Sequence, residues 1–388
     1  ILSAGHASML LYSMLYLTGH GIELQDIKDF RQMGSLTPGH PEVGVTPGVE
    51  VTTGPLGQGI ANAVGMALAE RHLQERLGSE VVNHRIWAIC GDGDLMEGLS
   101  HEAASLAGHQ QLGNLVVIYD DNRITIDGTT DLALSDDAQR RFESYGWDVR
   151  NLGETSADTD LLEKSLLRAG EQDLKPTLLI LRSRIGFPAP TAIDTPGAHG
   201  AITDDVEIAG AKQAMGIDPE LTFQVDEDVL AAYREAGLRG AKSREEWLAR
   251  VATSDLDDTW IDTLLTGTPV ANWVDELPKY EPGVSLATRN ANNQVIDALI
   301  DVVPSLVSGS ADLTGNTGTN IASDPMTPSN PGGRKLYYGV REHGMGSIAN
   351  GMALHGGVIP VVGTFLVFAD YMRPSVRMAA LSSAKVMF

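Results

Sequence analysis

Two apolar runs, each followed at once by a glycine-rich or acidic segment, constrain the fold of this chain more than any other feature. The run Arg85–Cys90 ends on the segment Gly91–Gly98, and the run Leu115–Tyr119 ends on Asp120-Asp121-Asn122. Residues 97–110 between them have the composition of a helix. This order predicts a strand–helix–strand unit with parallel strands. Such units bring the carboxyl ends of two strands to one edge of a sheet, where open α/β sheets bind ligands.

The predicted sheet edge carries two hard oxygen ligands. Asp92 offers a carboxylate, and Asn122, thirty positions later, offers an amide oxygen. Oxygen ligands of this kind suit Mg²⁺ or Ca²⁺ and leave coordination positions open for phosphate oxygens. The neighbouring glycines allow backbone N–H groups to approach those phosphates at the start of a helix. The pattern therefore predicts a divalent cation that binds a phosphate-bearing ligand.

The composition narrows the class of protein. The chain has 388 residues, enough for two or more domains, and a formal net charge of −23. That charge argues against nucleic acid as a partner. Cys90 is the single cysteine, so we expect a reducing cytoplasm. No run of eighteen apolar residues occurs in the sequence, which argues against a membrane span.

Alternating apolar runs and helical stretches predict an α/β fold with parallel sheets covered on both faces. We expect strands at 85–90, 115–119, 178–183, 306–310 and 358–362, and helices at 97–110, 227–252, 290–303 and 366–383. A Gly- and Pro-containing stretch at 265–284 is interpreted as a linker between domains 1–264 and 285–388. The abrupt termini suggest an internal fragment of a longer protein.

Residues 91–98 and 119–122 resemble the diphosphate-binding motif of thiamine diphosphate enzymes, and the whole chain resembles the transketolase family. The resemblance rests on eight ordered segments: Ser3–Ser8, Thr37–Glu42, Thr53–Gly59, Gly91–Gly98, Tyr119–Asn122, Ser310–Leu313, Gly339–His343 and Thr364–Tyr371. It implies a thiamine diphosphate-binding fold, with a diphosphate-binding domain followed by an incomplete pyrimidine-binding domain. It also implies further chain before Ile1 and after Phe388.

The resemblance assigns roles in the first domain. The metal ion, Mg²⁺ or Ca²⁺, would be held by Asp92, Asn122 and the main-chain oxygen of Ile124. His40 would face the hydroxyl groups of the donor sugar, and His199 would combine substrate, cofactor and catalytic roles. The remaining contacts to thiamine diphosphate would come from His6, Gly54, Pro55, Leu56 and Gly93.

Glu342 is the residue with the clearest expected catalytic role. In enzymes of this kind a buried glutamate with a raised pKa shares a proton with the aminopyrimidine ring, so that the ring's exocyclic nitrogen can remove the C2 proton of the thiazolium. Glu342 also stands where a helix begins, a position that the helix dipole favours. Phe365, Phe368 and Tyr371 are spaced by three and are interpreted as an aromatic pocket for the pyrimidine, with Phe368 stacking on it.

Two positions bear on the substrate phosphate. Arg289 matches an arginine that binds this phosphate as a bidentate fork. The family has a second phosphate contact, a serine, where this chain has Thr314–Thr319, so Asn316 or Thr317 would replace it. The resemblance also implies a homodimer whose active sites lie at the interface, with Glu97 and Glu102 among the interface acids.

The resulting hypothesis is a transketolase that moves a two-carbon ketol unit from a ketose phosphate to an aldose phosphate through a dihydroxyethyl intermediate on thiamine diphosphate. A dihydroxyacetone synthase, which uses formaldehyde as acceptor, shares the motifs. Deoxyxylulose phosphate synthase and the homodimeric pyruvate dehydrogenase component are more distant alternatives, which Thr37–Pro41 and Arg289 disfavour. The alternative from another class is a binding subunit. Such a subunit would bind the cofactor without turnover or pair with a separately encoded partner.

Overall fold

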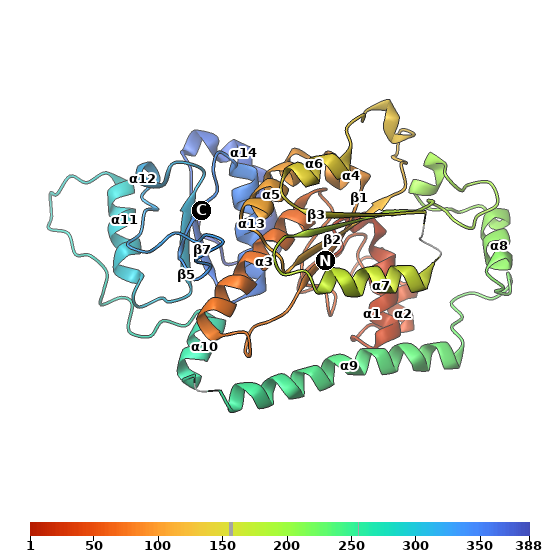
Figure 1. Cartoon of the computed structure of the whole chain (residues 1–388), viewed down its shortest axis with the longest axis horizontal. Coiled ribbons are helices and arrows are strands. Elements are labelled where there is room, and N and C mark those ends of the chain that lie inside the picture. The colour runs from red at the N-terminus through yellow and green to blue at the C-terminus, as the bar shows by residue number, and fades with distance from the viewer. Residues whose placement is uncertain (155–157, 255) are drawn as a thin grey trace.

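The computed structural model describes residues 1–154, 158–254 and 256–388, which form two all-parallel β-sheets with helices packed around them (Figure 1). The first sheet has the strand order β1-β2-β4-β3, and the second has the order β6-β5-β7. The strands are β1 (Ile86–Gly91), β2 (Leu115–Asp121), β3 (Asp148–Gly153), β4 (Thr177–Arg182), β5 (Leu306–Ser310), β6 (Lys335–Tyr337) and β7 (Ile359–Gly363).

Helices connect the strands as expected for parallel sheets. In the N-terminal unit they are α1 (Ser8–Thr18), α2 (Leu24–Lys28), α3 (Gln58–Leu77), α4 (Asp92–Met96), α5 (Gly98–His109), α6 (Ala138–Ser144) and α7 (Thr159–Gly170). Then follow α8 (Asp205–Ala214), α9 (Glu227–Ala252) and α10 (Asp258–Thr266). The C-terminal unit contains α11 (Thr288–Leu299), α12 (Thr314–Thr317), α13 (Glu342–His355) and α14 (Ala369–Leu381).

Helices α3 and α13 lie between the two sheets and join them (Figure 1). Their backbones come unusually close, because a Cβ added to Gly65 of α3 would lie 2.0 Å from the carbonyl oxygen of Ile348. A Cβ added to Gly351 of α13 would lie 2.0 Å from the carbonyl oxygen of Asn62. One apolar core runs from the first sheet through these helices to β5 and β7, so the two units share a single interior.

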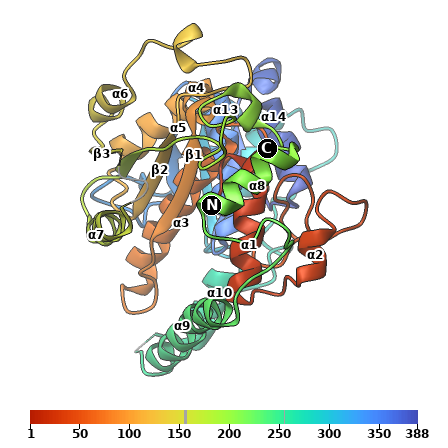
Figure 2. The ribbon, with the colours of Figure 1, turned by 90° about the vertical axis from the view of Figure 1, so that its right-hand side faces the viewer.

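The long helix α9 runs along one side of the molecule and packs against α1 (Figures 1 and 2). Gly237 of α9 lies against Thr18, since a Cβ there would meet the Thr18 carbonyl oxygen at 2.1 Å. Further along, the indole nitrogen of Trp247 donates to the Val81 carbonyl at 2.7 Å. The bounds of α9 match the helix predicted at 227–252, and none of its residues is fully buried.

The structure confirms the α/β class and the predicted elements, with shifted ends. The helix predicted at 97–110 is α5, and the short helix α4 precedes it from Asp92. The prediction of one helix at 366–383 was wrong in its first turn, where a 3₁₀ turn at Leu366–Phe368 comes before α14. The helix predicted to reach residue 303 ends at Leu299. Residues 300–305 form a turn and an irregular segment that lead into β5.

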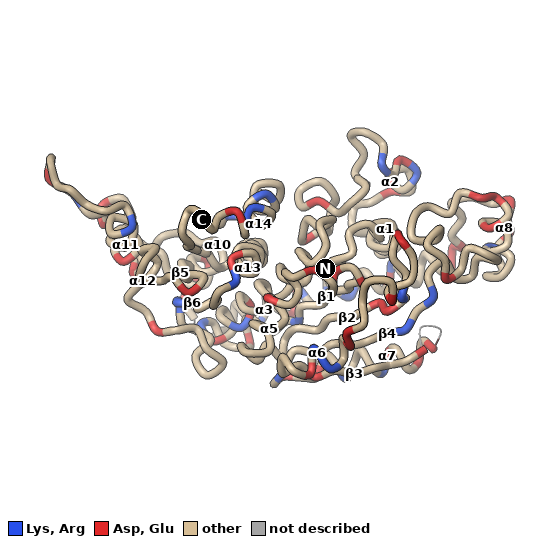
Figure 3. The backbone as a smooth tube through the Cα atoms, turned by 90° about the horizontal axis from the view of Figure 1, so that it is seen from above, with Lys and Arg blue, Asp and Glu red and all other residues tan. Residues whose placement is uncertain are grey.

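Acidic residues outnumber basic ones along much of the backbone (Figure 3). Among the described residues, no helix is both long enough and apolar enough to cross a membrane.

Candidate functional site

Asp92 lies at the carboxyl end of β1, where the strand passes into α4. Its side chain is only 5% exposed. The Tyr119 hydroxyl donates to Oδ1 at 2.5 Å, and the Arg123 backbone N–H donates to Oδ2 at 3.2 Å. Burial raises the pKa of Asp92 to about 6, and the nearby carboxylates of Asp121 and Asp120 oppose the lowering effect of its two donors. A carboxylate in this position gains stability from a bound cation.

Asn122 follows β2 at the same edge of the sheet, because β1 and β2 pair in parallel with Gly91 opposite Asp120. Its amide oxygen accepts from the Ile124 N–H at 2.9 Å, which turns the chain back over the strand end. Ile124 is buried and forms a bridge with Thr129. A polar cavity of about 710 Å³ opens beside these strand ends and is lined in part by Asp92, Tyr119 and Arg182.

Among the described residues, no group of three or more His, Cys, Asp or Glu side chains could hold a metal ion. The predicted metal site does not require one, because it draws on one carboxylate, one amide and one main-chain oxygen. Oxygen donors of this mixed kind suit Mg²⁺ or Ca²⁺ when a phosphate supplies the rest. The donor set therefore fits the predicted ion, although its occupancy stays a prediction.

Asp94 holds three loops of the site together, a role that was not predicted from the sequence. Its fully buried carboxylate accepts from the Ser3 hydroxyl at 2.7 Å, from the Gly57 N–H at 2.8 Å and from the Gly91 N–H at 3.0 Å. The segments that carry His6, Gly54 and Asp92 are thereby fixed to one another. The available signal was an Asp three residues after Gly91, the spacing at which an acidic side chain reaches back to cap a helix start.

Three predicted histidines gather beside this edge. The rings of His6 and His199 stack with their centroids 5.0 Å apart. The pKa of His6 lies below its ordinary value because of partial burial and the neighbouring His199 and His40, and Asp94 opposes this effect. Nδ1 of His199 is buried without a hydrogen-bond partner, as is the Thr53 hydroxyl on the adjoining loop. Buried polar atoms of this kind require a partner, which a bound polar ligand supplies.

The loop Gly54–Leu56 lies across the glycine-rich turn. Gly54 has φ +138°, and a Cβ on it would lie 3.2 Å from the His40 ring. The Leu56 side chain covers Gly93, where a Cβ would lie 2.8 Å from Leu56 Cδ1. The absence of side chains at Gly54 and Gly93 therefore lets the His40 ring and the Leu56 side chain approach the backbone at these two positions. Pro55 is exposed on the same loop.

Glu342 is the first residue of α13, as the sequence suggested. It is half-buried, so the expected full burial is not met within one chain. The Thr364 hydroxyl donates to Oε1 at 3.3 Å, which joins Glu342 to the segment that carries Phe365. Glu102 of α5 is close by and accepts from the Gly344 N–H at 2.6 Å. Burial raises the pKa of Glu102, as does the neighbouring charge of Glu342, and the Gly344 N–H and Arg341 oppose the shift.

The three predicted aromatic residues form one connected group. The rings of Phe365 and Phe368 lie 5.9 Å apart, and those of Phe368 and Tyr371 lie 6.1 Å apart. Phe365 is 40% exposed and Tyr371 is 66% exposed. An exposed group of neighbouring aromatic rings is typical of a binding surface. Proteins that act without a partner rarely leave such a cluster in contact with water.

Arg289 and Asn316 lie on α11 and α12, which pack against each other. A Cβ added to Gly318 would lie 2.0 Å from the Arg289 carbonyl oxygen. Both side chains are exposed. The Thr317 hydroxyl is already bonded to the Leu313 carbonyl at 3.0 Å and to Thr319 at 2.9 Å. Of the two residues considered for the second phosphate contact, Asn316 therefore has the freer side chain.

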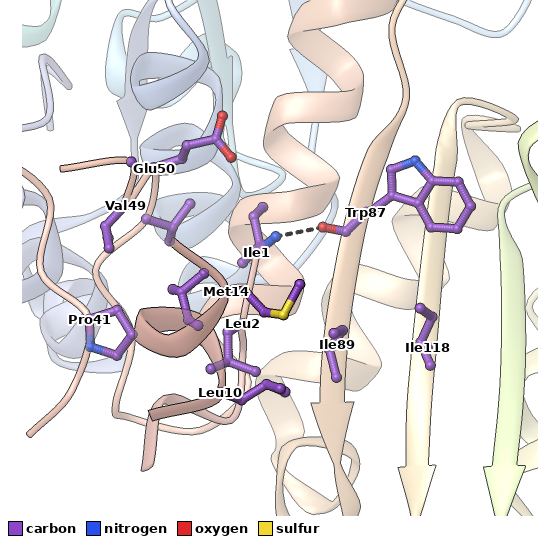
Figure 4. A pocket seen from close by; sticks show the side chains of 13 residues that line it. Ile1, Leu2, Leu10, Met14, Pro41, Val49, Glu50, Trp87, Ile89 and Ile118 are labelled. Carbon is purple, nitrogen blue, oxygen red and sulfur yellow. Dashed lines mark hydrogen bonds between the residues drawn. The ribbon is translucent and has the colours of Figure 1, made fainter. Parts of the chain in front are cut away.

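The predicted residues fall into two groups within the chain. The first surrounds the edge of the first sheet, and the second, with Glu342, the aromatic residues and Arg289, belongs to the C-terminal unit. Among the described residues, no hydrogen bond, ion pair or aromatic contact joins the two groups directly. An apolar pocket of about 280 Å³ between α1 and β1 contains none of the predicted site residues in its lining (Figure 4). There the Ile1 amino group donates to the Trp87 carbonyl at 2.7 Å (Figure 4).

Comparison with known sequences and structures accounts for both units. The model "Transketolase, thiamine diphosphate binding domain" matches residues 1–260, and "Transketolase, pyrimidine binding domain" matches residues 284–388. The transketolase of Geobacillus stearothermophilus is 45% identical over 397 aligned residues, which cover 100% of this chain and 59% of that protein. "Transketolase-1, chloroplastic" of Arabidopsis thaliana is 44% identical, with 100% of this chain and 54% of that protein covered.

Two solved transketolase structures have the same fold as this chain. The structure of transketolase from Leishmania mexicana superimposes with a TM-score of 0.95 at 39% identity, covering 100% of this chain and 59% of that chain. The Pichia stipitis transketolase complex with sedoheptulose-7-phosphate gives a TM-score of 0.95 at 40% identity, with the same coverage.

The fold and the strand-end site therefore define a protein with a thiamine diphosphate-binding domain joined to a pyrimidine-binding domain. The chain belongs to the transketolase family. It spans about three-fifths of the length of the bacterial relative described above.

Proposed function

We propose that the protein containing this chain is a transketolase, which transfers a two-carbon ketol unit from a ketose phosphate to an aldose phosphate. The gathering of His6, His40 and His199 near Asp94, two residues after Asp92, carries the proposal, because it brings imidazoles that could face a sugar to the sheet edge that holds a cation ligand. The structural relative from Pichia stipitis in complex with sedoheptulose-7-phosphate supports sugar phosphates as the substrate class.

Thiamine diphosphate would supply a carbon acid whose conjugate base is the nucleophile for the ketose carbonyl, and a ring that accepts the negative charge that develops. Asp92, Asn122 and the Ile124 main chain would hold Mg²⁺ or Ca²⁺ against its diphosphate. The backbone of Gly93 and of Gly54–Leu56 would line the cofactor, with His6 and His199 beside it. His40 would orient the hydroxyl groups of the sugar.

In this proposal the second group of residues acts on a neighbouring subunit's cofactor. Glu342 would hold a proton at the pyrimidine ring, and Phe365, Phe368 and Tyr371 would grip that ring. Their exposure in the single chain supports a homodimer with the site at the interface. Glu97 and Glu102 remain candidates for that interface.

Calorimetric titration of thiamine diphosphate tests the metal site. We expect binding with Mg²⁺ present, strong weakening in EDTA, and loss of binding in Asp92→Ala, because the acidic strand ends would then repel the diphosphate. The matched control is Asp160→Ala, which changes an exposed acid on α7 that does not line the polar cavity. Equal affinity with and without the metal would remove Asp92 and Asn122 from this role.

The acceptor distinguishes the proposed activity from its nearest rival. With a ketose phosphate donor, we expect an aldose phosphate to be consumed much faster than formaldehyde. Faster turnover with formaldehyde would identify a dihydroxyacetone synthase instead. Cofactor binding without turnover of either acceptor in the full-length protein would indicate a binding subunit.

A further inference from the structure

Two histidines outside the candidate site meet where the loop before β1 reaches the carboxyl end of α13. Nε2 of His84 and Nε2 of His355 are 2.9 Å apart. Their rings are nearly parallel, at 10°, and the ring centroids are 5.0 Å apart. The distance between the ring centroids exceeds the distance between the two nitrogens by about the width of an imidazole ring. Each nitrogen therefore lies on the side of its ring that faces the other ring.

The hydrogen bonding of His355 fixes its tautomer. Nδ1 of His355 lies 3.0 Å from the Gly356 carbonyl oxygen, which can only accept a hydrogen bond. In the neutral ring Nδ1 therefore carries the hydrogen, and Nε2 presents its lone pair to His84. Metal-binding histidines have this same arrangement, in which the second ring nitrogen donates to a backbone carbonyl and orients the ligand. His355 is thus already in the tautomer that a metal ligand requires.

Both rings are uncharged at neutral pH. Partial burial and the neighbouring His355 lower the pKa of His84 to about 4. Burial also lowers the pKa of His355, although the Gly356 carbonyl and Glu50 act in the opposite direction. Metal ligation requires neutral imidazole. A metal ion would need only a shift of the His84 proton from Nε2 to Nδ1, with no net loss of a proton.

We propose that His84 and His355 bind a late first-row transition-metal ion, Cu²⁺ or Ni²⁺, through their two Nε2 atoms. Nitrogen–metal bonds are about 2.0–2.1 Å long, so nitrogens 2.9 Å apart reach a common ion at nearly a right angle. That is the angle between neighbouring positions of a square-planar or tetragonal ion, the geometry of Cu²⁺ and Ni²⁺. Tetrahedral Zn²⁺ would require the nitrogens to move apart. The rings must turn to aim both lone pairs at the ion.

Water completes the coordination in this proposal. Among the described residues, no third His, Cys, Asp or Glu joins the pair. A pocket of about 350 Å³ lined by His84, Glu80 and Trp247, among others, provides access and room for water. The ion would link α13 of the C-terminal unit to the loop before β1 in the N-terminal unit, so its binding would stabilise the contact between the two units.

Titration of the 388-residue chain with nickel chloride alone, after removal of metals with EDTA, tests the site by calorimetry. We expect one bound equivalent that is weakened at least tenfold in His84→Gln and in His355→Gln. Two matched variants should keep it: His109→Gln, which changes an exposed histidine elsewhere, and His6→Gln, which breaks the His6–His199 pair. Nickel should raise the unfolding temperature of the wild type and of these two controls only.

A second measurement uses the wild-type chain alone and so does not depend on the folding of any variant. Electron paramagnetic resonance of the wild-type chain with one equivalent of Cu²⁺ should show two imidazole nitrogens bound to the ion. The proposal fails if the wild type binds no equivalent, if the equivalent survives either His84→Gln or His355→Gln, or if it is lost in His6→Gln. It also fails if the copper spectrum shows a single nitrogen.

Discussion

The Glu342 side chain is held by one hydrogen bond and is otherwise partly exposed to solvent. Thr364 fixes one carboxylate oxygen, and the half-exposed remainder of the side chain is free to meet another surface. The sequence motif identified Glu342 and the resemblance implied a site between subunits, but only the structure shows that this side chain is half-exposed within one chain. The same holds for the exposed aromatic group at Phe365–Tyr371.

Replacing Glu342 by Gln in the full-length protein should keep cofactor affinity and remove most of the turnover. The amide is nearly isosteric but cannot share the carboxylate's proton with the pyrimidine ring, and a loss of roughly 10²–10⁴-fold is typical of such groups. Exchange of the C2 proton of bound thiamine diphosphate, followed by NMR, measures the step directly. Exchange at the wild-type rate would show that Glu342 has another role.

Arg289→Ala should raise the Michaelis constant for phosphorylated donors far more than for hydroxypyruvate, which has no phosphate. A hydrogen bond to a charged group is worth about 1.5–3 kcal/mol and a neutral one about 0.5–1.5 kcal/mol. Asn316→Ala should therefore act in the same direction but more weakly. Steady-state kinetics with both donors make the comparison. An equal effect of Arg289→Ala on the two donors would mean that the arginine is structural.

Candidate site residues could be proposed from the sequence where they belong to short motifs at strand ends. Asp92, Asn122 and Gly93 follow from the motif, and the structure places His6 and His199 together. Asp94 was overlooked because its function is to accept three hydrogen bonds from distant loops, and only the folded chain brings those donors to one carboxylate.

At the scale of the element, the more apolar strands were predicted, whereas several helices and the more polar strands were not. Helix α3 is buried on nearly every side, so its sequence lacks the polar face that marks a surface helix. Strand β3 is a polar edge strand with an irregular register between Asn151 and Gly153, and it lacks the alternation expected of a strand. Helix α9, with its charged sequence, was predicted with the correct ends.

Helix α3 also predicts a dependence of stability on pH. His72 is fully buried, its Nδ1 lies 3.0 Å from the Pro331 carbonyl, and its Nε2 lies 3.3 Å from Arg76 Nη1. Burial and the Arg76 charge lower its pKa from 6.5 to about 4. As the pH falls below 6.5, His72 is protonated in the unfolded chain but not in the folded one. The free energy of unfolding should therefore decrease by about 1.4 kcal/mol for each pH unit between 6.5 and 4.

Urea unfolding at pH 7 and pH 5 measures this effect. His72→Gln keeps a donor and an acceptor but cannot be protonated, so its stability should fall less between the two pH values. His109→Gln, which changes an exposed histidine, should behave as the wild type. If His72→Gln and the wild type lost the same stability, the acid sensitivity would lie elsewhere.

At the scale of the whole molecule, the close crossing of α3 and α13 makes the two units one body. Gly65→Ala would place a methyl group against the Ile348 carbonyl and should destabilise the chain by about 1–3 kcal/mol, as overpacking does. The matched control is Gly240→Ala in α9, where a Cβ meets nothing within 4 Å and helix propensity should add up to about 1 kcal/mol. Thermal unfolding compares the two variants. Equal melting temperatures would mean that the helices separate to admit the methyl group.

The crossing of α3 and α13 also has a consequence for biosynthesis. The face of α3 that carries Gly65 is synthesised first, and α13, the helix that covers it, begins 265 positions after α3 ends, at Glu342 after Leu77. Until then the nascent N-terminal unit exposes an apolar face to water, a state that favours aggregation and recruits chaperones. Folding of the first unit is thus completed by a segment of the second, and synthesis must pass residue 355 before either interior is closed.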